Sequence, residues 1–253
     1  MTEARQNQYG GRMLIGRDRE LQELTAGILD AAAGTGGLFM VGGEPGIGKS
    51  RLVEAAAELA QRNGLGVYWG RCWEAGGAPP YWPWIQILRS VCESNDAPEL
   101  VAVPGGAALV QLLRELSDRF EVSRPDSELE PEQARFQLMD AVAGALRLTA
   151  RGNPIAIVVE DLHAADPASV GLLEFVARQI RGMSAVVIGT FREADAKSKG
   201  VGDVLVRIQR EARSTLRLGA LNEADVVECI HSAVGVEVGP RVVAAIRDAS
   251  EGN

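Results

Sequence analysis

The sequence predicts a three-layer α/β fold built on a parallel sheet, and three observations carry this prediction. Apolar runs at residues 38–41, 155–159 and 185–188 show no polar alternation, which is typical of strands buried on both faces of a parallel sheet. A segment with helical periodicity follows each run. A glycine-rich loop joins the first run to its helix. Alternating strands and helices indicate one sheet that is covered by helices on both sides.

The composition excludes several other classes of protein. A chain of 253 residues with 46% hydrophobic and 24% charged residues can form a core and is not wholly disordered. No apolar run approaches the roughly 18 residues that span a bilayer, and polar residues 1–12 lack the apolar stretch of a signal peptide. The three cysteines have no metal-binding or redox spacing. We therefore expect a cytoplasmic protein with reduced thiols and no membrane partner.

The charge of the chain argues against one class of partner. The formal net charge is −8 and the sequence pI is about 5.0, without a dense Lys/Arg run. Duplex nucleic acid is bound through clustered cations that release counterions, so we expect no direct nucleic-acid binding by this segment. The two histidines supply a zinc site or a Ser-His-Asp triad poorly.

The elements of the first part follow from periodicity and from helix start and stop signals. A helix is expected from Asp18 to Gly34, a strand over 38–41, a helix over 49–62 and a strand over 66–69. The stretch 71–153 is less regular. Its predicted helices run from Pro83 to Leu88, over 109–120 and over 131–148, with an acidic loop at 123–130.

An aromatic and proline-rich cluster at residues 79–84 opens this stretch. We favour packing over base stacking for it, because interleaved Lys and Arg residues are missing.

The alternation of strand and helix returns after residue 153. The predicted strands lie at 155–159, 185–188 and 215–218. One predicted helix begins at Pro167, and three others cover 204–212, 223–233 and 240–249. The chain ends directly after the last helix, so we expect it to be the N-terminal part of a longer polypeptide.

The strongest motif is the sequence Gly-Glu-Pro-Gly-Ile-Gly-Lys-Ser at residues 43–50. Its glycines let backbone N–H groups turn inward toward phosphate oxygens, and the following helix N-terminus adds partial positive charge. Lys49 is expected to neutralise the β and γ phosphates, and Ser50 to offer its hydroxyl to Mg²⁺. The predicted ligands are therefore ATP and Mg²⁺.

Two acids follow the second apolar strand. Glu160 and Asp161 would lie at the carboxyl edge of the sheet, where open α/β sheets bind ligands. One acid can hold Mg²⁺ and the other can orient or deprotonate an attacking water. The alternative, two ordinary surface acids, is disfavoured by the phosphate-binding loop earlier in the chain.

Arg192 ends the next strand and could sense the γ-phosphate there. An equally weighted alternative is a surface arginine paired with the adjacent Glu193. His163 lies close to the acids without metal-ligating partners in sequence, so a structural hydrogen bond is expected for it.

Several segments together resemble AAA-type signal-transduction ATPases. These are origin-recognition-like AAA domains of STAND proteins, large LuxR-type regulators and some multidomain cyclases. The resemblance covers residues 14–253. It rests on residues 14–21 (Leu-Ile-Gly-Arg-Asp-Arg-Glu-Leu), 43–52, 78–84, 135–136, 160–166, 189–192, 218–221 and 251–253.

The resemblance implies a P-loop NTPase fold of the AAA/ASCE type. It implies a parallel five-stranded sheet of order 5-1-4-3-2, with the Arg192 strand between the P-loop strand and the Glu160 strand. The implied organisation is a lead at 1–12, an ATPase domain at 13–220 with a mostly helical insertion at 71–153, and the start of a truncated helical lid at 221–253.

The resemblance also implies roles for individual residues. Glu160 would join Ser50 at the metal, and Asp161 would activate water, with Lys49 and Arg192 as further catalytic groups. The residues implied to contact the nucleotide are Gly43, Glu44, Pro45, Gly46, Ile47, Gly48, Lys49, Ser50 and Arg51 in the loop, and Ile15, Gly16 and Arg17 around the adenine.

The chain departs from the family pattern at three places. Glu160 stands where the family usually has Asp, which keeps the charge and alters its reach. Ala164 replaces a common aromatic residue, and the polar stretch 193–202 looks looser than usual.

The function that these features favour is an ATP-binding, slowly hydrolysing switch module of a larger signalling or transcriptional regulator. Its partners would be ATP or ADP, further copies of the chain or output domains in the same chain, and a neighbouring subunit could supply an arginine finger. The rivals are an ATP-driven DNA-loading or remodelling ATPase, a small-molecule kinase, and a partner module that binds nucleotide without hydrolysing it.

Overall fold

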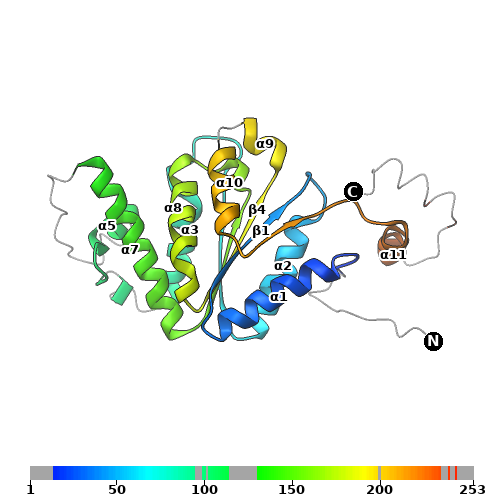
Figure 1. Ribbon diagram of the computed structural model, residues 1–253, viewed down its shortest axis with the longest axis horizontal. Coiled ribbons are helices and arrows are strands. Elements are labelled where there is room, and N and C mark those ends of the chain that lie inside the picture. Colours follow the sequence, from blue (N-terminus) through cyan, green and yellow to red (C-terminus); the bar gives the residue numbers. More distant parts are fainter. Residues whose placement is uncertain are drawn as a thin grey trace.

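The computed structural model describes residues 14–94, 99–100, 102–113, 130–198, 201–234, 239 and 243. Its centre is a sheet of five parallel strands in the order β2-β3-β4-β1-β5 (Figure 1). The strands are β1 (Gly37–Gly42), β2 (Gly66–Arg71), β3 (Ile155–Glu160), β4 (Ala185–Phe191) and β5 (Ser214–Arg217). The family resemblance implied this strand order, so that expectation is confirmed.

Helices cover both faces of the sheet, so the predicted three-layer fold is confirmed (Figure 1). One face carries α1 (Asp18–Ala32) and α2 (Lys49–Arg62). The opposite face carries α3 (Trp82–Ser94), α8 (Pro167–Gln179) and α10 (Gly202–Glu211), with α7 (Pro131–Gly152) beside α8 and α5 (Gly106–Leu112) against α7. The remaining elements are α9 (Glu193–Ser198), α11 (Glu223–Val234) and the 3-10 turns η1 (Leu162–Ala164) and η2 (Ile180–Gly182).

Burial on both faces explains why the strands read as continuous apolar runs. Every residue of β1, β3 and β4 is buried. Along β1, Phe39 and Val41 belong to the core beneath α1 and α2, whereas Leu38 and Met40 belong to the core beneath α3 and α8. Alternate side chains of a strand point to opposite faces, so a strand between two helical layers needs no polar residue.

The aromatic cluster packs α3 against its neighbours. The Trp84 side chain is fully buried, and its Nε1–H donates to the Ser169 carbonyl of α8 at 3.0 Å. A Cβ atom at Gly70 in β2 would lie 2.3 Å from the Pro83 carbonyl oxygen, so only glycine permits this close approach of β2 and α3. The packing interpretation is confirmed for Trp84.

The structure differs from the sequence-based expectation after Arg192. The stretch that looked loose contains the short helix α9. Its first turn carries Glu193 and Asp195, and acidic side chains stabilise a helix N-terminus. Three other expectations, namely the lead at 1–12, the helix at 109–120 beyond residue 113 and the acidic loop at 123–129, lie outside the described residues. So does the helix at 240–249, apart from Val243.

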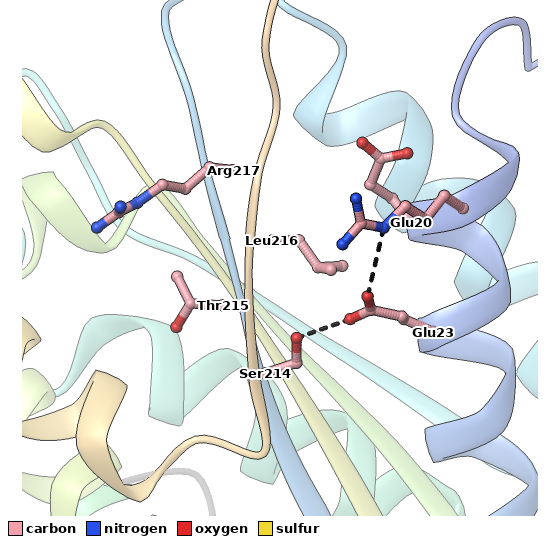
Figure 2. Close-up of a pocket in the computed structure, with 7 residues that line it drawn as sticks. Glu20, Glu23, Ser214, Thr215, Leu216 and Arg217 are labelled. Carbon is pink, nitrogen blue, oxygen red and sulfur yellow. Dashed lines mark hydrogen bonds and ion pairs between the residues drawn. The ribbon is translucent and has the colours of Figure 1, made fainter.

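Strand β5 forms one edge of the sheet, and a groove of about 510 Å³ separates it from α1 (Figure 2). The Ser214 hydroxyl donates to a Glu23 carboxylate oxygen at 2.7 Å, and Arg19 lies 3.9 Å from the same carboxylate. Arg217 points away from the groove in Figure 2 and pairs with Glu193 at 2.9 Å. The hydrogen bond between Ser214 and Glu23 thus ties α1 to the sheet edge. Among the described residues, no helix combines the length and the apolar character that a membrane crossing requires.

Candidate functional site

The glycine-rich loop lies between β1 and α2 and turns through three glycines with positive φ. Gly43, Gly46 and Gly48 have φ values of 157°, 81° and 98°. The left-handed conformation of Gly48 immediately precedes α2, and glycine adopts it without steric cost. Ile47 is buried and anchors the loop in the core beneath α1. Glu44 and Pro45 are exposed, so the outer rim of the loop is open to solvent.

Lys49 projects back over the loop from the first residue of α2. Its Nζ donates to the carbonyl oxygens of Gly43 and Glu44, at 2.8 Å each. Burial lowers the pKa of the Lys49 ammonium, and the Arg192 guanidinium lowers this pKa further. The nearby carboxylates of Asp161, Glu44 and Asp195 act in the opposite direction. Two cations are therefore brought together here, and an anion between them would relieve their repulsion.

The next two residues of α2 are accessible beside the loop. The Ser50 side chain is exposed and Arg51 is partly exposed. A hydroxyl oxygen and a carboxylate oxygen are hard donors of the kind that Mg²⁺ takes from proteins, so Ser50 and Glu160 fit the chemistry expected of a magnesium site.

Glu160 and Asp161 lie at the carboxyl end of β3 and differ in environment. Glu160 is 4% exposed, and one of its carboxylate oxygens accepts a hydrogen bond from Arg71 Nε at 3.1 Å. This bond raises the pKa of the Arg71 guanidinium. Asp161 takes a left-handed conformation with φ of 61°, and its backbone N–H donates to the Thr190 hydroxyl at 2.9 Å. Arg71 Nε also lies 3.9 Å from Asp161 Oδ2, so one guanidinium contacts both acids, and Glu160 is the more deeply buried of the two.

Arg192 directly follows β4, which lies between β1 and β3 in the sheet. Its Nη2 lies 3.2 Å from Glu74 Oε1 and its Nη1 lies 3.4 Å from Asp195 Oδ2. The alternative pairing with Glu193 is wrong, because Glu193 starts α9 and pairs with Arg217 instead. His163 has the expected structural hydrogen bond: it is fully buried, with Nε2 at 3.0 Å from Glu74 Oε1.

Residues 15–17 connect the glycine-rich loop to the end of the sheet. The buried Arg17 donates from Nη2 to the Ile47 carbonyl at 3.1 Å and to the Gly219 carbonyl at 2.7 Å. Gly16 has a φ of 67°, and a Cβ atom there would lie 2.4 Å from the Asp225 carboxylate of α11. The Arg17 guanidinium therefore fixes the loop and the end of the sheet relative to each other, and the contact of residues 15–17 with adenine stays a prediction.

Replacement of Arg17 should cost stability. Arg17→Ala leaves two carbonyl groups without their charged donor, so we expect the free energy of unfolding to fall by about 1–3 kcal/mol. Urea denaturation measures the change. Arg19→Ala is the matched control, because its side chain is 89% exposed in an (i, i+4) pair of a kind that contributes little. Equal losses in the two variants would contradict this role of Arg17.

Three contributors to the site had no role in the sequence analysis. Arg71 ends β2, which is the neighbour of β3, and a cation at that position could have been found from the implied strand order. Thr190 lies within residues 189–192, which carry part of the family resemblance, but no role was expected for it. Glu74 lies in the loop after β2, and no local pattern singles it out.

Comparisons with known proteins agree with the fold and the loop. A model of the AAA ATPase domain family matches residues 13–188, more than half of the chain. An uncharacterized protein of Rhizobium meliloti (strain 1021) is 29% identical over 211 residues, which are 74% of this chain and 19% of that protein. The chain thus spans about a fifth of the curated relative that it matches.

Solved structures from archaea share the architecture. The ORC2 protein of Aeropyrum pernix has a TM-score of 0.54 at 14% identity, covering 93% of this chain and 56% of its own. The ORC1 protein of the same organism, in complex with DNA, has a TM-score of 0.51 at 15% identity, covering 94% and 56%. A STAND protein with a tetratricopeptide repeat sensor, from Pyrococcus horikoshii, has a TM-score of 0.52 at 16% identity, covering 95% and 28%.

At these identities the likeness to solved structures shows the fold alone, which is that of the origin-recognition proteins and of a STAND ATPase. The match to the family model includes the glycine-rich loop and both acids after β3. The chain therefore belongs to the AAA ATPase domain family.

Proposed function

We propose that this chain is the Mg²⁺-dependent, ATP-binding and slowly hydrolysing switch module of a larger signalling or transcriptional regulator. One observation carries the proposal: Lys49, the acids after β3 and Arg192 gather at the carboxyl ends of three adjacent strands, around the glycine-rich loop. This is the edge at which open α/β sheets bind ligands.

The proposed binding mode assigns one role to each of these groups. Backbone N–H groups of residues 43–50 hold the phosphates, Lys49 neutralises the β and γ phosphates, and residues 15–17 and Arg51 border the rest of the nucleotide. Ser50 and Glu160 would hold Mg²⁺, which screens phosphate charge when it is bound. Asp161 orients and deprotonates the attacking water, and Arg192 contacts the γ-phosphate.

The proposed switch depends on charged side chains that would exchange their present protein partners for the nucleotide and its metal ion. Lys49 donates to loop carbonyls, Arg71 to Glu160, and Arg192 faces Glu74 and Asp195. A nucleotide that recruits Lys49 and Arg192 must release the contacts of these two side chains with the loop, Glu74 and Asp195, and Mg²⁺ at Glu160 would compete with Arg71. Binding energy can therefore favour one arrangement of these elements over another.

The greater length of the similar proteins supports a place for this module in a larger regulator. The chain covers 28% of the STAND protein named above and 19% of its curated relative. Output domains elsewhere in a longer chain would convert the nucleotide state of this module into a signal.

Single-turnover hydrolysis of radiolabelled ATP tests the proposal directly. We expect slow, Mg²⁺-dependent release of phosphate to water, with a rate that rises with protein concentration if a neighbouring copy supplies an arginine. Binding of ATP without phosphate release at any concentration would favour a module without hydrolysis. Transfer of phosphate to another acceptor would favour a kinase.

Duplex DNA binding should separate the proposal from a DNA-loading ATPase. We expect weak binding by residues 1–253 at physiological salt, because the net charge is −8 without a dense cationic run. Fluorescence anisotropy with labelled duplex measures this. Submicromolar, salt-sensitive binding, or an ATPase rate stimulated by DNA, would overturn the expectation.

A further inference from the structure

Arg192 lies in a cluster with three titratable side chains, Glu74, His163 and Asp195, that have no part in the hydrolysis proposed above. Glu74 comes from the loop after β2, His163 from η1 and Asp195 from α9. Glu74 Oε1 lies 3.0 Å from His163 Nε2 and 3.2 Å from Arg192 Nη2. Asp195 Oδ2 lies 3.4 Å from Arg192 Nη1 and 3.9 Å from His163 Nε2. Two carboxylates therefore share one guanidinium and one imidazole.

His163 gives Glu74 a fixed position although the loop is at the surface. The His163 side chain is 1% exposed, whereas the Glu74 side chain is 47% exposed. A hydrogen bond from a buried ring, whose own position is set by core packing, restricts the rotamers of the carboxylate. Glu74 is thereby held where it faces Arg192.

The same cluster has the composition of a metal site, since ligand atoms of Glu74, Asp161 and His163 lie within 4.8 Å of one another. Arg192 already places a positive charge 3.2 Å from Glu74. A cation bound there would have to displace the guanidinium. An anion that approaches Arg192, by contrast, competes with Glu74 for it.

We propose that Glu74 is a specificity-determining residue that competes with the γ-phosphate for Arg192 and so limits how strongly the site prefers ATP over ADP. His163 is the positioning residue for Glu74. The inference deepens the proposed function and rests on it. ADP has no γ-phosphate, so only ATP must draw Arg192 from Glu74, and only ATP binding carries that cost.

Glu74→Gln tests the proposal through the ratio of the Kd for Mg·ADP to the Kd for Mg·ATP, both measured by calorimetry. Gln keeps the size of the side chain and removes the charge that holds Arg192. We expect the ratio to rise about threefold to tenfold, through tighter ATP binding, with the Kd for ADP nearly unchanged. An unchanged ratio, or a weaker affinity for ATP, would overturn the proposal.

Glu193→Gln is the matched control. Glu193 is next to Arg192 in sequence and is 49% exposed, but it pairs with Arg217. Its loss should leave the ratio unchanged. An equal rise in both variants would mean that any negative charge near the site opposes ATP, and the specific role of Glu74 would be refuted.

The Arg192→Ala variant tests whether Glu74 acts by competing with the γ-phosphate for Arg192. If Glu74 acts by holding Arg192, Glu74→Gln should change the ratio in the parent and have no effect in the Arg192→Ala variant, so the two substitutions are coupled. An undiminished effect in that background would show direct repulsion between Glu74 and the phosphate, which contradicts the proposal.

His163 is tested with a pair of variants whose fold is checked by thermal unfolding. His163→Gln can keep an N–H donor toward Glu74 and should retain the parent ratio, whereas His163→Leu loses the donor and should raise the ratio. Folded variants with equal ratios would refute the positioning role of His163.

The result for the parent chain distinguishes a failure of the proposed function from a failure of the inference about Glu74. If the parent does not bind Mg·ATP, the proposed function fails and the inference fails with it. If the parent binds Mg·ATP through Lys49 and the Glu74→Gln ratio is unchanged, only the inference fails.

Discussion

Asp161→Asn should slow single-turnover hydrolysis about 10²–10⁴-fold while leaving the Kd for Mg·ATP nearly unchanged. General-base assistance acts in the transition state, so its loss lowers the rate more than it lowers ground-state binding. Asn suits the position structurally, because Asp161 has a φ of 61° and Asn tolerates the left-handed region well. The hydrogen bond from the backbone N–H to Thr190 does not depend on the replaced carboxylate.

Glu160→Gln is the companion to this variant. Glu160 is the acid proposed at the metal, so its neutralisation should weaken the affinity for Mg·ATP and the response to Mg²⁺ together. An Asp161→Asn effect below tenfold, in a parent that hydrolyses measurably, would contradict the role of Asp161. If Glu160→Gln spared binding and Asp161→Asn abolished it, the two roles would be exchanged.

Lys49→Ala should weaken ATP binding at least about thirtyfold, which corresponds to about 2 kcal/mol. Backbone N–H groups cannot replace a full charge at the β and γ phosphates. Calorimetry with Mg·ATP measures the change. Without nucleotide the fold should persist, because the substitution removes a buried cation whose pKa is lowered by burial and by Arg192, and this relief offsets the two hydrogen bonds lost.

Arg62→Ala is a control for the loss of a cation from the same helix. Arg62 ends α2 and forms an (i, i+4) pair with Glu58, so the Kd for ATP should not change. Equal ATP affinity in Lys49→Ala and the parent would show that the loop does not bind phosphate in the proposed way.

The parts of the fold that could be predicted from sequence are those encoded locally. Strand β3 is buried on both faces, so its apolar run was visible without any tertiary information. The loop at 43–50 has a fixed spacing, and that spacing places Lys49 at the start of α2. Helix α9 was missed because its six residues, Glu-Ala-Asp-Ala-Lys-Ser, contain no large apolar side chain that would mark a helical period.

The contacts of the charged side chains could not be predicted, because they depend on strand order and loop conformation. Arg192 was considered against its sequence neighbour Glu193, but it faces Glu74 on a loop that follows a strand two places away in the sheet. The two backbone carbonyls that Arg17 bonds lie far from it in the sequence, so no local pattern reveals this contact. The limits of the ATPase domain at 13–220 and of the lid at 221–253 stay predictions.

Amide hydrogen exchange with Mg·ATP and with Mg·ADP tests most directly whether these strand ends form one nucleotide site. The account predicts that residues 43–50 gain protection with either nucleotide, because the loop holds phosphates common to both. The exchange rates of residues 190–195 should change with ATP only, because Arg192 contacts the γ-phosphate. Absence of protection at residues 43–50 with ATP, or identical exchange at residues 190–195 with ATP and ADP, would contradict the account.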